Sequence, residues 1–442
     1  MRAGNELACT GMPRRQIVFC LRDLWAFLQQ GSIYSQQHSP VVRLPGPPER
    51  SYLERMSDAI SARRALILGT AVADAASMGL HWIYAQPRIR HIAGDTPEFA
   101  EPNAENYEGV PSYFAHAGRH AGDFSMYGES LLVVLRSVAA SGKFDWQHYA
   151  QAFQEHFGFG GEYVGYIDTP TRETLTNMIV ENRRILERAM EVPFDGPEKA
   201  KKAVASKVLG NAQLARGDAL REKVEEAIRM TKGGDDQIEL AHRMIEVLEG
   251  SRSMPGADDV QMPALTKAPV LVAAFPDDAD LDSMIEEAVR VTNDNDVAVD
   301  WARFVAGLYR WALASDDPRG GLEAEVRRRT AEAPDHIREA MEPVFKRLGD
   351  DTKTVTMKVG PACELKSGVP AAIHNLLTSS SYTEAVRRNI LACGDSCGRG
   401  MVVGGLAGIM YADDSDAGIP EEWIARLTRR GEVEELVSSV VQ

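Results

Sequence analysis

The sequence has few cysteines, no long apolar run and almost no alternation of β-branched residues. Its five cysteines, in a chain of 442 residues, are too few and too clustered for a disulfide framework. Cys393 and Cys397 are four positions apart, which is not a usual zinc spacing, and no histidine pair follows them. A chain of this length can bury a core without disulfides or structural metals. The cysteines therefore indicate reduced thiols in a cytoplasmic protein.

Basic residues are also scarce relative to acidic ones. The chain has 49 Lys and Arg against 64 Asp and Glu, for a formal net charge of −15. A surface that binds a nucleic-acid duplex needs clustered cations, so we expect no nucleic-acid partner. No apolar run approaches the ~20 residues of a membrane helix, so we expect no membrane partner either. The sequence leaves the oligomeric state open.

The first 55 residues differ in composition from the rest. They contain seven arginines, no lysine and four acidic residues. The apolar stretch at 16–21 is too short for a secretory signal, and the acidic residues argue against a transit peptide. The prolines of Pro40–Arg50 indicate a linker. We predict that residues 1–55 are a disordered extension, or that translation begins at Met56, and that residues 56–442 form one helical domain.

The remainder of the chain shows the 3.6-residue apolar period of helices. We expect helices at Ser61–Tyr84, Ser130–Ser141, Asp145–Phe157, Thr171–Met190, Glu198–Ala215, Asp235–Glu249, Met262–Phe275, Leu281–Val291, Asp296–Ala314, Glu323–Arg347, Val369–Thr378, Tyr382–Ala392, Met401–Tyr411 and Pro420–Thr428. Residues 85–125 are expected to form a long loop, and Thr352–Val359 a weak strand. The predicted fold class is all-α, a single orthogonal multi-helix bundle.

The strongest local pattern is Cys-Gly-Asp-Ser-Cys-Gly-Arg-Gly at 393–400. A Gly-Asp-Ser break before an apolar helix places Asp395 or Ser396 near the helix N-terminus, where free N–H groups favour anions and capping oxygens. A carboxylate beside a hydroxyl also suits magnesium. Gly404 and Gly408 share one helical face, so another helix can approach closely. An N-cap followed by a packing face would explain these residues without any function.

Other acidic positions give weaker signals. Asp74 interrupts an otherwise apolar helix, and a buried carboxylate is costly unless it is paired or metal-bound. Residues 122–129 form a glycine-bearing acidic junction between a loop and a helix. Residues 258–259 and 293–296 could suggest calcium loops. However, the EF-hand spacing is absent, and capped helix starts explain both segments better.

The order of these patterns resembles the ADP-ribosylglycohydrolase family, which includes dinitrogenase-reductase-activating enzymes and J-type crystallins. The resemblance covers most of the chain, from about Ala65 to Leu427. Its anchors are residues 69–75, 127–129, 368–372, 394–396 and 419–423. The resemblance implies an all-helical fold that holds two magnesium ions. It also implies hydrolysis of the glycosidic bond between ADP-ribose and a protein side chain or small molecule, with the metals orienting the ribose and activating water.

Both metal motifs of the family are altered in this chain. The first reads Thr-Asp-Asp-Thr, and its best match, Met-Tyr-Gly-Glu at 126–129, keeps only Glu129 as an oxygen ligand. The second reads Gly-Gly-Asp-Thr-Asp-Thr. Residues 393–398 match it at Asp395 and Ser396 but have Cys and Gly where the motif has its second Asp and Thr. Because a thiol is a poor partner for Mg²⁺, the sequence predicts an incomplete magnesium site with Asp395 and Ser396 as its remaining ligands.

Two hypotheses for the function follow. In the first, the protein is a hydrolase acting on a small molecule or an ADP-ribosylated protein, with carboxylates as general acid and base. The candidate catalytic residues are Asp395, Glu129 and Asp74, and the candidate substrate-binding residues are Tyr127, Gly128, Ser396, Cys397 and Arg399. His81, His116 and His120 could join them only if the fold brings them close. In the second, the protein is a non-catalytic, crystallin-like structural or ligand-binding member of the family.

Within the first hypothesis, two of these residues have specific expected roles. Arg399 could pair with a phosphate or a carboxylate of the substrate. Cys397 could act as a nucleophile if a helix N-terminus stabilised its thiolate.

Overall fold

The structure, a computed structural model, describes residues 52–442 except 213–216 and 251–253. Most of the predicted N-terminal extension, with Cys9 and Cys20, lies outside the described residues. The α-helices are α2 (Tyr52–Met78), α3 (Gln86–Ala93), α4 (Met126–Ser141), α5 (Trp146–Phe157), α6 (Thr169–Glu191), α7 (Glu198–Ala212), α8 (Gly217–Met230), α9 (Asp235–Gly250), α10 (Ala268–Ala274), α11 (Leu281–Arg290), α12 (Asp296–Ala314), α13 (Pro318–Glu332), α14 (Asp335–Phe345), α15 (Thr352–Val359), α16 (Leu365–Leu377), α17 (Tyr382–Leu391), α18 (Ser396–Met410), α19 (Glu421–Ile424) and α20 (Arg430–Val440). Two 3-10 helices are η1 (Ala104–Tyr107) and η2 (Met262–Lys267).

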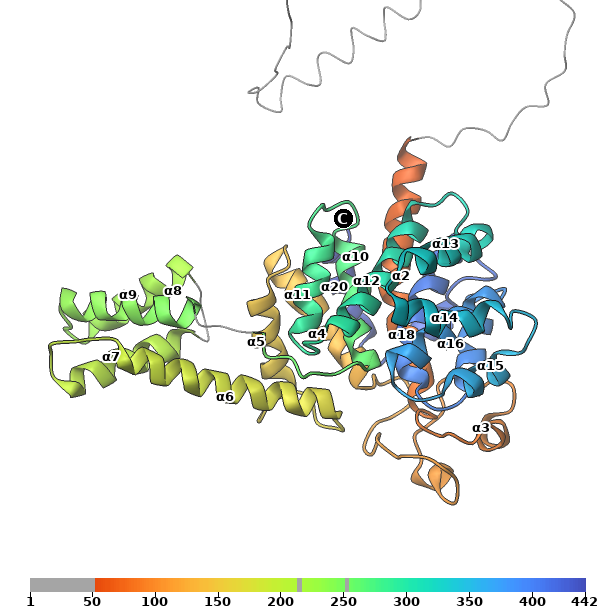
Figure 1. Ribbon diagram of the computed structural model, residues 1–442, viewed down its shortest axis with the longest axis horizontal. Coiled ribbons are helices and arrows are strands. Elements are labelled where there is room, and N and C mark those ends of the chain that lie inside the picture. Colours follow the sequence, from red (N-terminus) through yellow and green to blue (C-terminus); the bar gives the residue numbers. More distant parts are fainter. Residues whose placement is uncertain (1–51, 213–216, 251–253) are drawn as a thin grey trace, which may run out of the picture. The chain divides into compact units, whose positions relative to one another are not determined.

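The described part of the chain contains isolated β-bridges but no strand, so the prediction of an all-α fold is confirmed (Figure 1). None of the helices described is long and apolar enough to cross a membrane.

Helices α2 and α18 pack together through small residues and run in opposite directions. A Cβ at Gly404 would overlap the carbonyl oxygen of Gly69, and one at Gly408 would overlap another carbonyl of α2. The predicted close approach of a second helix at these glycines is therefore confirmed. The same pairing brings the first turn of α18 to Asp74, because the Cys397 thiol lies 3.7 Å from the Asp74 carbonyl oxygen as a donor.

Polar side chains cap the helices that surround this pair. Ser125 caps α4 and Asp395 caps α18, each by accepting a hydrogen bond from a backbone N–H of the first turn. Asn295 caps α12 by accepting from the N–H groups of Val297 and Ala298. The interpretation of residues 293–296 as a capped helix start is therefore confirmed.

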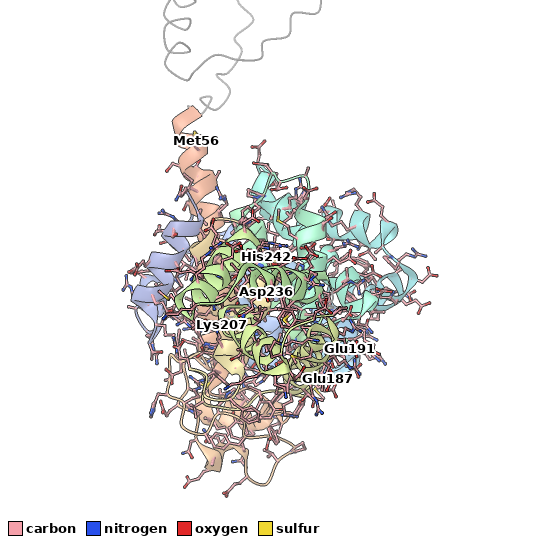
Figure 2. The ribbon with its side chains drawn as sticks, turned by 90° about the vertical axis from the view of Figure 1, so that its left-hand side faces the viewer. Met56, Glu187, Glu191, Lys207, Asp236 and His242 are labelled. Carbon is pink, nitrogen blue, oxygen red and sulfur yellow. The ribbon has the colours of Figure 1, made fainter. Side chains whose placement is uncertain are left out.

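Helices α6 to α9 share a second hydrophobic cluster, separate from the main core. It includes Val208 of α7, Val224 of α8 and Met244 of α9. Figure 2 views these helices and labels Lys207 on α7 and Asp236 on α9. The apolar period of the sequence predicted α6, α7 and α9, but it did not predict α8 or show that the four helices have a core of their own.

Several predictions of local structure are wrong. The predicted strand Thr352–Val359 is helix α15, which begins where the Asp351 carboxylate accepts a hydrogen bond of 3.0 Å from the Thr354 N–H. The predicted helix Glu323–Arg347 is two helices, α13 and α14, because Pro334 disfavours helical geometry at the residue before it. The predicted loop between α2 and α4 contains α3 and η1, and α20 follows the helix that we expected to be the last.

Candidate functional site

Asp74 is fully buried on α2 and is held by one residue from the start of α4. Its Oδ2 accepts the Ser125 N–H at 2.8 Å, and its Oδ1 accepts the Ser125 hydroxyl at 2.5 Å. Burial raises the pKa of Asp74 to about 7, although the hydrogen bonds from Ser125 oppose the shift and nearby Glu129 adds to it. Asp74 can therefore exist in either protonation state near neutral pH.

Asp395 is the N-cap of α18 and is also fully buried. Its Oδ1 accepts the Gly398 N–H at 3.0 Å, and its Oδ2 accepts the Tyr127 hydroxyl, also at 3.0 Å. Burial raises the pKa of Asp395, and Arg399 opposes that shift. Burial, reinforced by Asp395, also holds the pKa of Tyr127 well above its usual value, so the phenol stays protonated and acts as a donor.

Glu129 lies on α4 with its carboxylate buried among cationic and imidazole groups. Its Oε1 is 3.3 Å from Arg119 Nη1, and its Oε2 is 3.0 Å from His156 Nε2. Arg429 Nη2 approaches the same carboxylate to 3.9 Å. Glu129 therefore has its own partners, separate from those of the other two candidate acids, Asp74 and Asp395.

The first turn of α18 contains a buried thiol and a hydroxyl without a hydrogen-bond partner. The Cys397 N–H donates to His81 Nδ1 at 3.2 Å, which leaves His81 Nε2 as the protonated nitrogen of the neutral ring. Burial keeps the pKa of Cys397 well above its usual value, so this geometry favours a thiol over a thiolate. The hydroxyl of Ser396 is buried and has no hydrogen-bond partner among the described residues.

Arg399 is buried and directs its guanidinium at main-chain and amide oxygens. Its Nε donates to Asn389 Oδ1 at 2.9 Å, and its Nη2 donates to the Asn389 and Cys393 carbonyls at 3.1 and 2.5 Å. Nη1 lies 3.5 Å from the Pro361 carbonyl oxygen. These contacts tie the end of α17 to the start of α18, so in this geometry Arg399 supports the loop that positions Asp395.

The rings of Trp82 and His116 pack against His81. His81 Nδ1 is 3.6 Å from Asp395 Oδ1, and the His81 ring lies 4.4 Å from that of Trp82 and 5.4 Å from that of His116, between centroids. The Trp82 ring in turn lies 5.2 Å from the Tyr166 ring, between centroids. Within the described residues, Trp82 Nε1 and His116 Nε2 are buried and have no hydrogen-bond partner. His81 thus lies beside Asp395, and His116 lies against His81.

His120 does not share this environment. Its Nδ1 lies 2.9 Å from Glu101 Oε1 in a pair whose side chains are 76% and 56% exposed. The fold therefore places His81 beside the buried Asp395 and His116 against His81, and leaves His120 at the surface.

A second group of buried ionisable residues lies where α6, η2 and α12 meet. Lys267 is fully buried, and its Nζ donates to the Pro263 carbonyl at 2.7 Å and to the Thr292 hydroxyl at 2.5 Å. Burial lowers the pKa of Lys267 to about 7, although Asp168 and Asp259 oppose the shift. Burial raises the pKa of Asp168 to about 6. Apart from the Asp258-Asp259 pair, no pattern in the sequence indicates this group.

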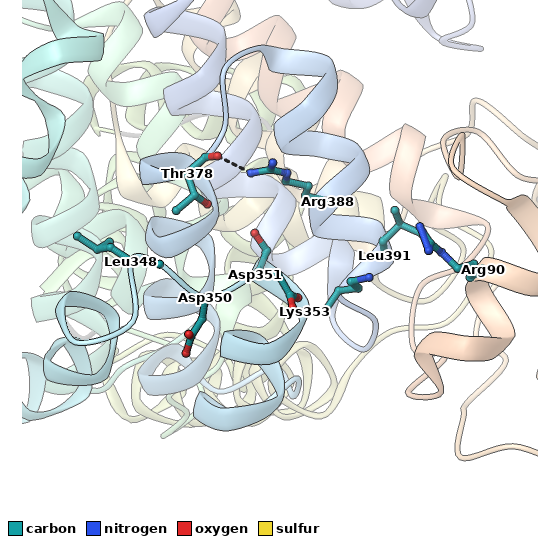
Figure 3. A pocket seen from close by; sticks show the side chains of 10 residues that line it. Arg90, Leu348, Asp350, Asp351, Lys353, Thr378, Arg388 and Leu391 are labelled. Atoms are coloured by element: carbon teal, nitrogen blue, oxygen red, sulfur yellow. Dashed lines mark hydrogen bonds between the residues drawn. The ribbon is translucent and has the colours of Figure 1, made fainter.

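A pocket of about 430 Å³ has none of Asp74, Glu129 and Asp395 in its walls (Figure 3). Its walls come from α3, the α14–α15 connection, the end of α16 and α17. Figure 3 shows Arg388 directed at the carbonyl of Thr378, a hydrogen bond that ties α17 to α16. None of the site residues predicted from the sequence lines this pocket.

Comparisons with known proteins agree with this fold. The profile of the ADP-ribosylglycohydrolase family matches residues 56–442. The chain belongs to this family. It is 25% identical to crystallin J1A of Tripedalia cystophora, over 84% of this chain and 93% of that protein. It is 24% identical to crystallin J1B of the same organism, over 86% and 96% of the two chains.

Among solved structures, the fold is similar to one described as an ADP-ribosylglycohydrolase-related protein complex. The TM-score is 0.54 at 18% identity, over 87% of this chain and 98% of that chain. At this identity the likeness shows the fold alone. The predicted family membership and fold class are both confirmed.

The residues of this ADP-ribosylglycohydrolase family member do not fit the pair of magnesium ions that the family implies. No group of three or more His, Cys, Asp or Glu side chains in the described ranges is placed to hold a metal. Asp395 already accepts hydrogen bonds from Tyr127 and Gly398, and a Cβ at Gly128 would overlap Asp74 Oδ2. Magnesium requires a near-octahedral shell of oxygens, which these positions do not supply. We therefore assign no chemical step to a metal.

The predicted site residues converge where α2, α4 and α18 meet, and the structure adds residues that the sequence reasoning did not select. Ser125 holds Asp74, and Asn389 holds Arg399. Ser125 could have been found from its position, because serine directly before an apolar helix is a common N-cap. Asn389 gave no such signal, since only the fold brings it to Arg399.

Proposed function

We propose that the protein binds a glycosidic ligand of the ADP-ribosyl class at the junction of α2, α4 and α18 and hydrolyses its glycosidic bond. The observation that supports this proposal is a set of buried polar atoms without partners, on Ser396 next to Asp395 and on the two rings packed against His81, whose Nδ1 lies 3.6 Å from Asp395 Oδ1. Ser396 Oγ, Trp82 Nε1 and His116 Nε2 are sealed from solvent, and no described residue pairs with them. Such atoms destabilise the fold unless water or a ligand pairs with them. The hydroxyls of a sugar have the chemistry to do so.

The carboxylates beside these atoms suit the chemistry of glycoside hydrolysis. One carboxyl group must protonate the leaving group, and a carboxylate must activate water or attack the sugar. Asp74 has a pKa of about 7, so it can give or take a proton at neutral pH. Asp395 accepts one hydrogen bond at each oxygen, and each carboxylate oxygen can accept a second. We assign Asp395 and Asp74 as the acid–base pair, with Glu129 supporting them electrostatically.

The test is hydrolysis of ADP-ribosyl-arginine and ADP-ribosyl-serine by the purified full chain, followed by release of the free amino acid. Magnesium chloride is present, so that a metal-requiring activity would also be detected. We expect turnover that falls by roughly 100-fold or more in Asp395→Asn, because general acid–base catalysis is worth that much. Asp350→Asn, at the separate pocket, is the control and should retain turnover. Absence of turnover on both substrates, or full turnover in Asp395→Asn, would contradict the proposal.

The second candidate function is a non-catalytic, crystallin-like role. It is favoured by the protein partners that all three acids already have: Ser125 for Asp74, Tyr127 for Asp395, and His156 for Glu129. The similarity to two crystallins supports the same alternative. Binding of ADP-ribose without turnover of either substrate would indicate a ligand-binding member. Neither binding nor turnover would indicate a structural one.

A further inference from the structure

We propose that direct hydrogen bonds within the protein have replaced the dinuclear metal centre, so that this chain folds and holds its site together without a divalent ion. The family's two metal motifs correspond to the start of α4 and the start of α18. In this chain those two helix starts are joined to each other and to α2 by hydrogen bonds between groups of the protein itself. The inference concerns what holds the site together and does not depend on turnover.

The first of these links joins α4 to α18. Tyr127, at a position where the family motif carries a metal-binding carboxylate, reaches Asp395 with its hydroxyl at 3.0 Å. Both side chains are fully buried. The neutral phenol of Tyr127 therefore donates a hydrogen bond to the carboxylate that, in the family motif, would bind a cation. The hydrogen bond satisfies Asp395 within the protein, where a metal would otherwise be needed to offset a buried negative charge.

The second link joins α4 to α2. Ser125 donates both its N–H and its hydroxyl to Asp74, so this carboxylate also has two donors from the protein. Ser125, which caps α4, and Asp74, the buried acid of α2, are thus directly hydrogen-bonded to each other. Because Ser125 also accepts the Tyr127 N–H at 3.1 Å, the two links share the first turn of α4.

The glycines in the two motifs show that the lost ligands have not left empty space. A Cβ at Gly128 would overlap Asp74 Oδ2, and a Cβ at Gly398 would overlap the Asp395 carboxylate. These two glycines stand where the family motifs carry Asp and Thr. The carboxylates of this chain occupy the volume that the missing side chains would need. The site is therefore repacked around its retained acids.

The test measures metal content and thermal stability of the purified full chain. A bound ion stabilises the folded state by an amount that grows with the logarithm of its free concentration relative to its Kd, so a metal-dependent site shows a Tm that falls in EDTA and rises with added metal. We expect substoichiometric magnesium and manganese by elemental analysis, and the same Tm in EDTA and in excess MgCl₂ or MnCl₂. One or more retained equivalents, or a lower Tm in EDTA, would overturn the proposal. Neither readout uses hydrolysis, so failure here is distinct from failure of the proposed activity.

A gain-of-binding variant provides the second arm. Tyr127→Asp combined with Cys397→Asp restores carboxylates at two motif positions, and Tyr127→Asn with Cys397→Asn is its uncharged control. We expect added Mn²⁺ to raise the Tm of the Asp variant, or to fold it, and to leave the Asn variant unchanged. If Mn²⁺ raises both Tm values equally, or leaves a folded Asp variant unchanged, the lost carboxylates are not the reason for metal independence. If neither variant folds, the wild-type metal content and Tm decide.

Discussion

The hydroxyl of Tyr127 donates a 3.0 Å hydrogen bond to Oδ2 of Asp395, a residue 268 positions further along the chain. This contact joins the first turn of α4 to the N-cap of α18 in a fully buried environment. It also explains why a tyrosine is compatible with this position. The ring packs in the core, while its hydroxyl, the only polar atom of the side chain, donates to the Asp395 carboxylate that caps α18.

Removing this hydroxyl should destabilise the fold. Tyr127→Phe leaves Asp395 buried with one donor fewer, which should lower the free energy of unfolding by about 1–3 kcal/mol. Urea denaturation followed by circular dichroism measures the change. Tyr149→Phe is a matched control, because the Tyr149 hydroxyl is buried without a partner among the described residues and its loss should cost little. Equal destabilisation by both variants would show that the hydrogen bond contributes nothing specific.

Adding a methyl group at Gly128 should be harmful although alanine is the better helix former. The new Cβ would overlap Asp74 Oδ2 and the ring of Phe124, so Gly128→Ala should cost about 1–3 kcal/mol of unfolding free energy. Gly210→Ala is the control, because nothing lies within 4 Å of a Cβ at that helical position. It should stabilise the protein by up to about 1 kcal/mol. A neutral Gly128→Ala would mean that Asp74 can move away without cost.

Much of the fold could be predicted from the sequence because the relevant signals are local. The apolar period predicts most helices, the glycines of α18 indicate the close approach of another helix, and the Gly-Asp-Ser break places Asp395 or Ser396 near a helix N-terminus. The predictions of secondary structure failed where another interaction outweighed the intrinsic preference of the residues. The β-branched residues of Thr352–Val359 favour a strand, but the cap by Asp351 starts a helix there.

The candidate site could be predicted only in part, because its contacts span long separations in the chain. Asp74 meets Ser125 across 51 positions, and Tyr127 meets Asp395 across 268. The position of Arg399 beside Asp395 in the sequence suggested a role in substrate binding. The fold instead directs its guanidinium at carbonyls, which no pattern of residue types shows.

The buried Lys267 should make stability depend on pH on the alkaline side. Its pKa is about 7 in the folded protein and 10.5 when unfolded, so between these values the unfolded chain binds more protons. The free energy of unfolding should therefore rise as pH increases from 7 to 10, by at most about 1.4 kcal/mol per pH unit. Urea denaturation of wild type and Lys267→Met across this range isolates the effect, because the variant lacks this contribution. Lys358→Met, at an exposed lysine, should keep the wild-type slope. A slope that is the same in Lys267→Met and wild type would contradict the prediction.

Arg399 should prove essential to the loop that carries Asp395, and a lysine should not replace it. The guanidinium joins Asn389 and Cys393 through parallel donors that a single ammonium cannot reproduce. Arg399→Lys leaves buried oxygens without donors, so it should lower the free energy of unfolding by about 3 kcal/mol. Arg328→Lys is the matched control. Its ion pairs on α13 involve a side chain that is 50% exposed, so it should cost less than about 1 kcal/mol.

The comparison also separates the two roles considered for Arg399. If Arg399 positions the loop, Arg399→Lys lowers the Tm and weakens turnover and affinity for ADP-ribose together. If it binds a phosphate of the ligand, the variant keeps its Tm and loses only affinity for ADP-ribose, measured by calorimetry. The contacts of Arg399 with the Asn389 and Cys393 carbonyls favour the first outcome, because a donor that already meets a buried carbonyl must break that bond to reach a ligand.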